Sequence, residues 1–142
     1  MRIRSQADLE KARELGLKSL YPDKVKVMVG MGSCGLAAGA QAAYDSLRQE
    51  IEKRRLDAIV CRTGCIGFCE EEPLVDVLRP GMPRITYSQI TGEKASALIS
   101  GLGNGRLSKE WALCRMDEEE HLVRGETRRY PLGEVPGEAE DI

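Results

Sequence analysis

The feature that most constrains the fold is a strand, a glycine-rich loop, a helix and a second strand, in that order, over residues 24 to 61. The segment "KVKVMV" alternates polar and β-branched side chains, which is typical of a strand. After the loop "GMGSCG", apolar residues recur at helical spacing from about 37 to 54. The segment "DAIVC" predicts the second strand, and we expect it to be parallel to the first because a whole helix separates them. These residues therefore predict a βαβ unit.

Two further β-rich runs, "PLVDVLR" and "RITYSQI", follow this unit. The turn signal "PGMP" between them predicts a hairpin. A last helix is expected, with one apolar face made by Ala95, Leu98, Ile99 and Leu102. The order β-α-β-β-β-α is that of an α/β, thioredoxin-like fold, and we expect it to occupy residues 24–105 as one domain.

The two ends of the chain differ from this domain. Residues 1–23 contain a capping-box pattern, Ser5 with Asp8, which predicts an N-terminal helical arm that ends at Gly16. Residues 106–142 are charged, contain two prolines and show no sustained period. That composition predicts an irregular C-terminal tail of the kind that orders on a partner.

Composition excludes several classes of function. The formal charge is −2 and basic residues form no block, so nucleic acid is not an expected partner. No window approaches the roughly 18 apolar residues that a membrane span needs. The segment "MRIRSQADLE" lacks the apolar core of a signal peptide, and we expect a cytoplasmic protein. The single histidine, His121, lies in the charged tail, which disfavours a mechanism with a catalytic histidine.

Three of the five cysteines lie in two glycine-rich loops, each of which follows one strand of the parallel pair. Cys34 is in the first loop, and Cys65 and Cys69 form C-x3-C in the second. The glycines of interest in these loops are Gly32, Gly35, Gly64 and Gly67. If the strands are adjacent, both loops emerge at one edge of the sheet and the three thiolates converge, as iron-sulfur clusters and zinc require. Cys61, at the end of the second strand, is either a fourth ligand or a small buried side chain.

The segments "VGMGSCGLAAGA" and "TGCIGFCEEEPLVDV" together resemble the thioredoxin-like 2Fe-2S ferredoxin domain of NADH dehydrogenase and of NAD-linked bifurcating hydrogenases and formate dehydrogenases. The resemblance covers residues 24 to about 105 and implies a 2Fe-2S cluster held by Cys34, Cys65 and Cys69. The family pattern has a further cysteine where this chain has Val29, which cannot bind iron. The resemblance therefore implies atypical ligation. The fourth ligand would be Cys61, a partner's residue or a non-protein group.

The same resemblance implies a function. The chain would be an electron-transfer subunit of a multi-subunit, NAD(P)-dependent flavin and iron-sulfur oxidoreductase of NADH dehydrogenase, hydrogenase or formate dehydrogenase type, electron-bifurcating in some members. Its partners would be an FMN- and NADH-binding flavoprotein and other iron-sulfur subunits, docked through the N-terminal arm and the C-terminal tail. The loop glycines would let the backbone approach the cluster and aim N–H groups at its sulfurs. The alternative is a thioredoxin-like structural subunit whose cluster site is incomplete or lost.

Three other interpretations remain open. Gly30, Gly32 and Gly35 match the G-x-G-x-x-G turn of dinucleotide-binding folds, although the second strand ends in Arg62 without the expected acidic residue. Cys65 and Cys69 also suit thiol-disulfide exchange, although their spacing is wider than C-x-x-C. Three or four thiolates also satisfy structural zinc. The acidic run at residues 70–72 is expected to be solvated surface that flanks the cysteines.

Overall fold

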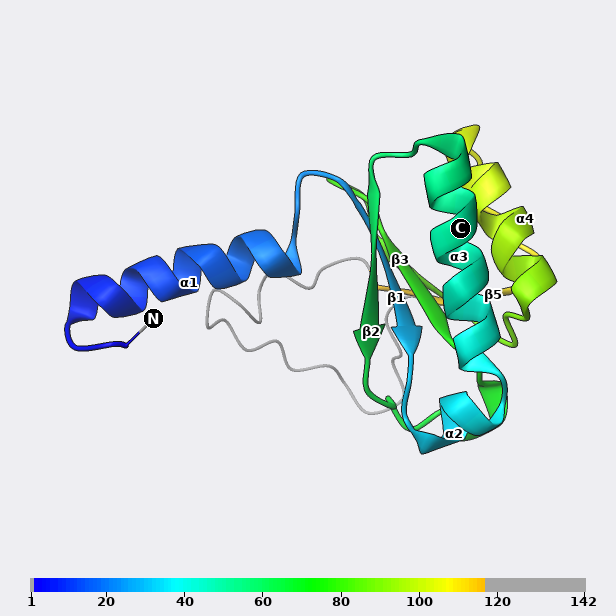
Figure 1. Ribbon diagram of the computed structural model, residues 1–142, viewed down its shortest axis with the longest axis horizontal. Helices are drawn as coiled ribbons and strands as arrows, with labels where there is room; N and C mark the ends of the chain where they lie inside the picture. The colour runs from blue at the N-terminus through cyan, green and yellow to red at the C-terminus, as the bar shows by residue number, and fades with distance from the viewer. Residues whose placement is uncertain (1, 117–142) are drawn as a thin grey trace, which may run out of the picture.

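A five-stranded mixed sheet with the strand order β2-β1-β3-β4-β5 organises the computed structural model, which describes residues 2–116 (Figure 1). The elements in chain order are α1 (Gln6–Leu20), β1 (Val25–Gly30), α2 (Ser33–Ala37), α3 (Ala40–Arg54), β2 (Ala58–Thr63), the 3₁₀ turn η1 (Cys69–Glu71), β3 (Val75–Leu78), β4 (Arg84–Tyr87), α4 (Gly92–Gly103) and β5 (Ala112–Met116). None of the helices in this range has the length and apolarity that crossing a membrane requires.

The predicted βαβ unit and hairpin are both confirmed. β1 and β2 pair in parallel, with Met28 opposite Cys61, so the loops that follow them emerge at one end of the sheet. β3 lies antiparallel to β1 on its other side and pairs with β4 as the predicted hairpin, with Asp76 opposite Thr86. The thioredoxin-like order β-α-β-β-β-α therefore holds from β1 to α4.

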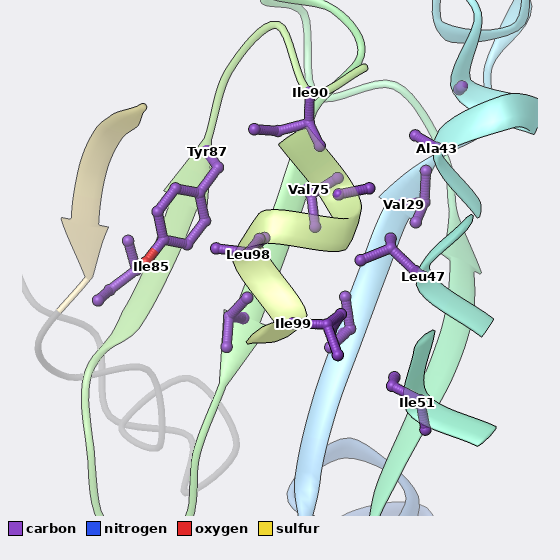
Figure 2. Close-up of a cluster of buried hydrophobic side chains, with 14 residues drawn as sticks. Val29, Ala43, Leu47, Ile51, Val75, Ile85, Tyr87, Ile90, Leu98 and Ile99 are labelled. Atoms are coloured by element: carbon purple, nitrogen blue, oxygen red, sulfur yellow. The ribbon is translucent and has the colours of Figure 1, made fainter. Parts of the chain in front are cut away.

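The hydrophobic core lies between the sheet and the two helices α3 and α4, which lie side by side (Figure 1). Alternate residues of β1, β3 and β4 belong to this core, and the buried residues of α3 recur at helical spacing. Figure 2 labels the main contributors: Val29, Ala43, Leu47, Ile51, Val75, Ile85, Tyr87, Ile90, Leu98 and Ile99. The buried residues of this core, within the described range, include no cysteine. The thiol-bearing loops are therefore attached to a scaffold that packs without them.

The N-terminal arm is a helix, as predicted, but it does not end at Gly16. The capping box is present: Ser5 Oγ accepts the Asp8 N–H at 3.2 Å, and Asp8 Oδ2 accepts the Ser5 N–H at 3.0 Å. The helix continues through Gly16, because a glycine inside a helix costs only about 1 kcal/mol and breaks no hydrogen bond. It ends at Tyr21, the residue before Pro22, where the proline disfavours helical backbone.

α1 projects away from the sheet and buries none of its residues (Figure 1). Its C-terminal end is tied to β1 by Lys26, whose Nζ donates to the carbonyl oxygens of Ser19 at 2.8 Å and Leu20 at 3.3 Å. A lysine at this position also compensates the negative end of the helix dipole. The arm is therefore fixed at one end and exposed along its length.

Two further elements differ from the sequence expectations. The helix expected from about residue 37 is preceded by the separate short helix α2, and the two are divided at Gly39, whose φ of 99° lies in the left-handed region. Residues 112–116, expected in an irregular tail, form β5 on the edge of β4, with Cys114 opposite Thr86. The run "ALCRM" has no strong strand pattern of its own, and its strand depends on the edge that β4 offers. The rest of the predicted tail, 117–142, lies outside the described residues.

Candidate metal centre

The two cysteine loops meet beside the ends of β1 and β2. The Sγ atoms of Cys34, Cys65 and Cys69 all lie within 4.8 Å of one another. Cys34 Sγ is 3.3 Å from Cys65 Sγ, which in turn is 3.5 Å from Cys69 Sγ. Cys34 is half-buried in the first turn of α2, and the other two are exposed. The structure thus brings together the three cysteines that the parallel-strand argument predicted to converge.

The predicted glycines contribute to this arrangement in different ways. A Cβ on Gly32 would lie 2.9 Å from Cys65 Cβ, so the two loops touch only because residue 32 has no side chain. Gly67 has a φ of 99°, and its N–H donates to Cys65 Sγ at 3.3 Å. A Cβ on Gly35 would clash with the carbonyl oxygen of Gly30. Gly64, by contrast, has no atom within 4 Å of the place its Cβ would take.

The thiols influence one another's ionisation. The hydrogen bond that the Cys34 thiol donates to Cys65 raises the pKa of Cys34 to about 12. The Gly67 N–H, followed by the thiols of Cys34 and Cys69, lowers the pKa of Cys65 below that of an ordinary thiol. Cys65 therefore ionises before Cys34, and the thiolate is the form that binds a metal.

A buried carboxylate lies beside this group. Glu72 is only 6% exposed, although the sequence predicted a solvated acidic run. Its Oε2 accepts the Leu74 N–H at 2.7 Å, and its Oε1 lies 3.8 Å from Cys34 Sγ. The sequence did not identify Glu72 as a buried residue, because a run of acidic residues has no periodic pattern that indicates which of them is buried.

The other positions considered as ligands or as cysteine sites lie away from the three converging thiols. Cys61 is on β2, outside the group of three, and because the neighbouring Val60 packs against the core, Cys61 faces the opposite side of the sheet. Val29 is fully buried in the core, near Ala43 of α3 (Figure 2). Cys114 belongs to β5, at the opposite edge of the sheet from β2. The structure therefore does not add any of these three side chains to the converging thiols.

The donor set fits an iron-sulfur cluster or zinc better than a nucleotide. Three exposed or half-buried thiols are the ligand type that both metals take from proteins. A pyrophosphate on the loop of Gly30, Gly32 and Gly35 would instead meet the Glu72 carboxylate, since a Cβ on Gly30 or Gly35 would lie 3.1 Å from its oxygens. Like charges repel at such distances, which disfavours the dinucleotide interpretation.

Known proteins resemble this chain in sequence and in fold. No family model matches the sequence. The chain is 27% identical over 101 residues to the NADP-reducing hydrogenase subunit HndB of Solidesulfovibrio fructosivorans, a match that covers 69% of this chain and 80% of that one. Its structure is similar to that of a thioredoxin-like [2Fe-2S] ferredoxin from Aquifex aeolicus, with a TM-score of 0.58 and 17% identity, over 66% of this chain and 93% of the ferredoxin. A second structure of that ferredoxin gives a TM-score of 0.56 with 16% identity, over 64% and 97% of the two chains.

Proposed function

Since this chain has the thioredoxin-like [2Fe-2S] ferredoxin fold, we propose that it is an iron-sulfur electron-transfer subunit of a multi-subunit, NAD(P)-dependent oxidoreductase. The observation that carries the proposal is the convergence of three thiols at the exposed end of the sheet. The similarity to a subunit of an NADP-reducing hydrogenase supports an assembly of hydrogenase type among the predicted types. Electron bifurcation is an optional property of such an assembly.

Cys34, Cys65 and Cys69 would hold the cluster, which supplies one-electron oxidation and reduction when bound. The Gly67 N–H would remain directed at Cys65 Sγ and tune the reduction potential. No substrate chemistry is assigned to this chain. The proposed electron-transfer domain is the predicted 24–105 region extended by β5, because β5 completes the sheet.

Two exposed apolar groups suit docking to larger subunits. The first consists of Leu36 on α2 and of Ile66 and Phe68 in the loop after β2, all near the cysteines in sequence. The second lies along the N-terminal arm and consists of Ile3, Leu9, Leu15 and Leu20. Exposed apolar side chains in such groups mark interaction surfaces. We assign the first group to the electron-transfer partner and the arm to an FMN- and NADH-binding flavoprotein subunit. The assembly would lie in the cytoplasm, whose reducing conditions keep the five cysteines from forming disulfides.

The test is anaerobic purification of the tagged full chain, alone and from its native host, followed by iron and sulfide analysis and EPR of the reduced protein. We expect about two irons and two sulfides per chain, and a flavoprotein that copurifies from the host. Cys34→Ser is expected to lose most of the iron, whereas Cys114→Ser, on the far edge of the sheet, is the matched control and keeps it. An iron-free wild-type chain, even beside its partners, contradicts the proposal and favours the structural-subunit alternative.

Structural zinc is a second candidate, because three sulfurs within 4.8 Å of one another also suit a single tetrahedral ion. The same metal analysis separates the two. About one zinc per chain, without iron, sulfide or an EPR signal, would assign the thiols to a structural ion.

A further inference from the structure

A two-iron cluster takes four protein ligands, and the converging cysteines supply three. Val29, where the family pattern has its fourth cysteine, is fully buried in the core, and within the described residues no fourth side chain, Cys61 included, has a ligand atom within 4.8 Å of all three sulfurs. We propose that the carboxylate of Glu72 is the fourth protein ligand. This inference rests on the proposed function, because it concerns the same cluster.

The position of the Glu72 carboxylate is the first argument. One oxygen, Oε2, is held by the Leu74 N–H at 2.7 Å, and the other, Oε1, lies 3.8 Å from Cys34 Sγ. The carboxylate therefore borders the group of thiols on the side of Cys34, which itself lies 3.3 Å from Cys65 Sγ.

Two glycines create the space that this carboxylate occupies. A Cβ on Gly30 would lie 3.1 Å from both carboxylate oxygens, and a Cβ on Gly35 would lie 3.1 Å from Oε2. Gly30 is the residue that follows Val29 at the end of β1. The Glu72 side chain therefore reaches, from a different loop, the strand end that carries the cysteine in the family pattern.

Burial and charge are the third argument. Glu72 is 6% exposed, and burying a carboxylate is costly unless a positive charge compensates it. The ion pairs found within residues 2–116 use other carboxylates, those of Glu50, Asp57 and Asp76. A cluster iron beside Cys34 would supply the missing positive charge.

Replacement of one cysteine ligand by Glu72 keeps the charges and the electrons balanced. A carboxylate carries the same single negative charge as a thiolate, so three cysteines and Glu72 give the ligand set the charge of four cysteines. Assembly from two ferric ions and two hydrosulfide ions releases the three thiol protons and the two hydrosulfide protons to solvent, makes four bonds from protein ligands to iron and changes no oxidation state. Oxygen is a harder donor than sulfur, so this ligand set differs from four thiolates in its spectrum.

The experiment compares the full-length wild-type chain with Glu72→Gln and Glu72→Cys, and uses Glu70→Gln as the matched control. Glu70 is an exposed neighbour in the same acidic run. Each chain is loaded anaerobically with ferric iron and sulfide, then challenged with a chelator. The readouts are iron per chain, the rate of iron loss, and the Mössbauer and absorption spectra.

We expect E72Q to lose iron at least about tenfold faster than the wild-type chain, since even residues that only support metal ligands change affinity by this factor. E72C is expected to retain iron and to shift both spectra towards those of a four-thiolate site. E70Q is expected to match the wild-type chain in every readout.

The possible failures are distinguishable. If the wild-type chain takes up no iron, both the proposed function and the Glu72 assignment are wrong. If it holds a cluster and E72Q matches it in spectrum and iron retention, only the Glu72 assignment is wrong. If circular dichroism shows that E72Q does not fold, the Mössbauer and absorption spectra of E72C test the assignment instead. Spectra of E72C that match those of the wild-type chain would contradict ligation of the cluster by residue 72.

Discussion

Tyr87 is the residue whose burial is least compensated within the core. It is fully buried on β4 among apolar side chains, and its hydroxyl has no hydrogen-bond partner within residues 2–116 (Figure 2). Burial raises the pKa of Tyr87 from 10.0 to about 12, because the phenolate would lose its hydration there. The ring stabilises the core while its hydroxyl opposes that effect.

We therefore expect Tyr87→Phe to raise the free energy of unfolding by about 1 kcal/mol at neutral pH, since it removes an unsatisfied buried hydroxyl. Between pH 10 and 12 the unfolded wild-type chain ionises Tyr87 before the folded chain does, so its stability falls as the pH rises. Y87F lacks this loss, and its advantage grows over that window. Urea unfolding at neutral pH and at about pH 11 measures both effects. Equal stability of the two proteins at both pH values would contradict the assignment.

At the scale of elements, the short helix α2 decides where the first thiol lies. It begins just after β1, and its residue Gly35 packs directly against the carbonyl oxygen of Gly30 and the Glu72 carboxylate. This contact holds Cys34, one residue earlier, beside Cys65. The close approach of backbone to backbone leaves no room for a side chain.

Gly35→Ala is expected to lower the free energy of unfolding by about 2 kcal/mol, because the new Cβ forces α2 away from β1. Helix propensity alone would favour alanine, so the sign of the change reports the clash. Gly64→Ala is the matched control, since no atom lies within 4 Å of its Cβ position, and we expect a change below about 0.5 kcal/mol. Urea unfolding of the three iron-free proteins gives the comparison, and similar values for G35A and wild type would argue against tight packing of α2.

At the scale of the whole molecule, the scaffold and the metal-binding loops are separate. The buried core is formed by residues of β1, β3, β4, α3 and α4, together with Ile90 just before α4. The thiols lie on α2, in the loop after β2 and at the start of η1. A bound cluster would therefore stabilise chiefly the loops, by binding the folded state.

Removal of iron with a chelator is accordingly expected to leave the far-ultraviolet circular dichroism spectrum unchanged. Amide exchange should accelerate in residues 63–72, while β1, β3 and α3 keep their protection. Hydrogen exchange followed by mass spectrometry, on loaded and iron-free chains, measures this directly. Loss of protection across β1 in the iron-free chain would show that core and cluster fold as one unit.

Local patterns in the sequence were sufficient to predict most of the helices and strands of the scaffold. Alternation of side chains marks β1, helical periodicity marks α3 and α4, and the Ser5–Asp8 box marks the start of α1. The parallel pairing of β1 and β2 then follows from the helix between them, and it accounts for the meeting of the two cysteine loops. These features are predictable because periodicity, capping and turn chemistry each depend on residues a few positions apart.

The tertiary structure decided the features that depend on distant segments. Glu72 is buried because the glycines of another loop leave a space for it, and β5 is a strand because β4 offers an edge. Cys61 is kept from the thiol group by the alternation of β2 within the assembled sheet. Whether a side chain is buried, and in which direction it points, depends on which distant segments of the chain pack beside it. The sequence thus determined the scaffold and the three converging cysteines, while the packing of distant loops decided that a carboxylate stands beside them.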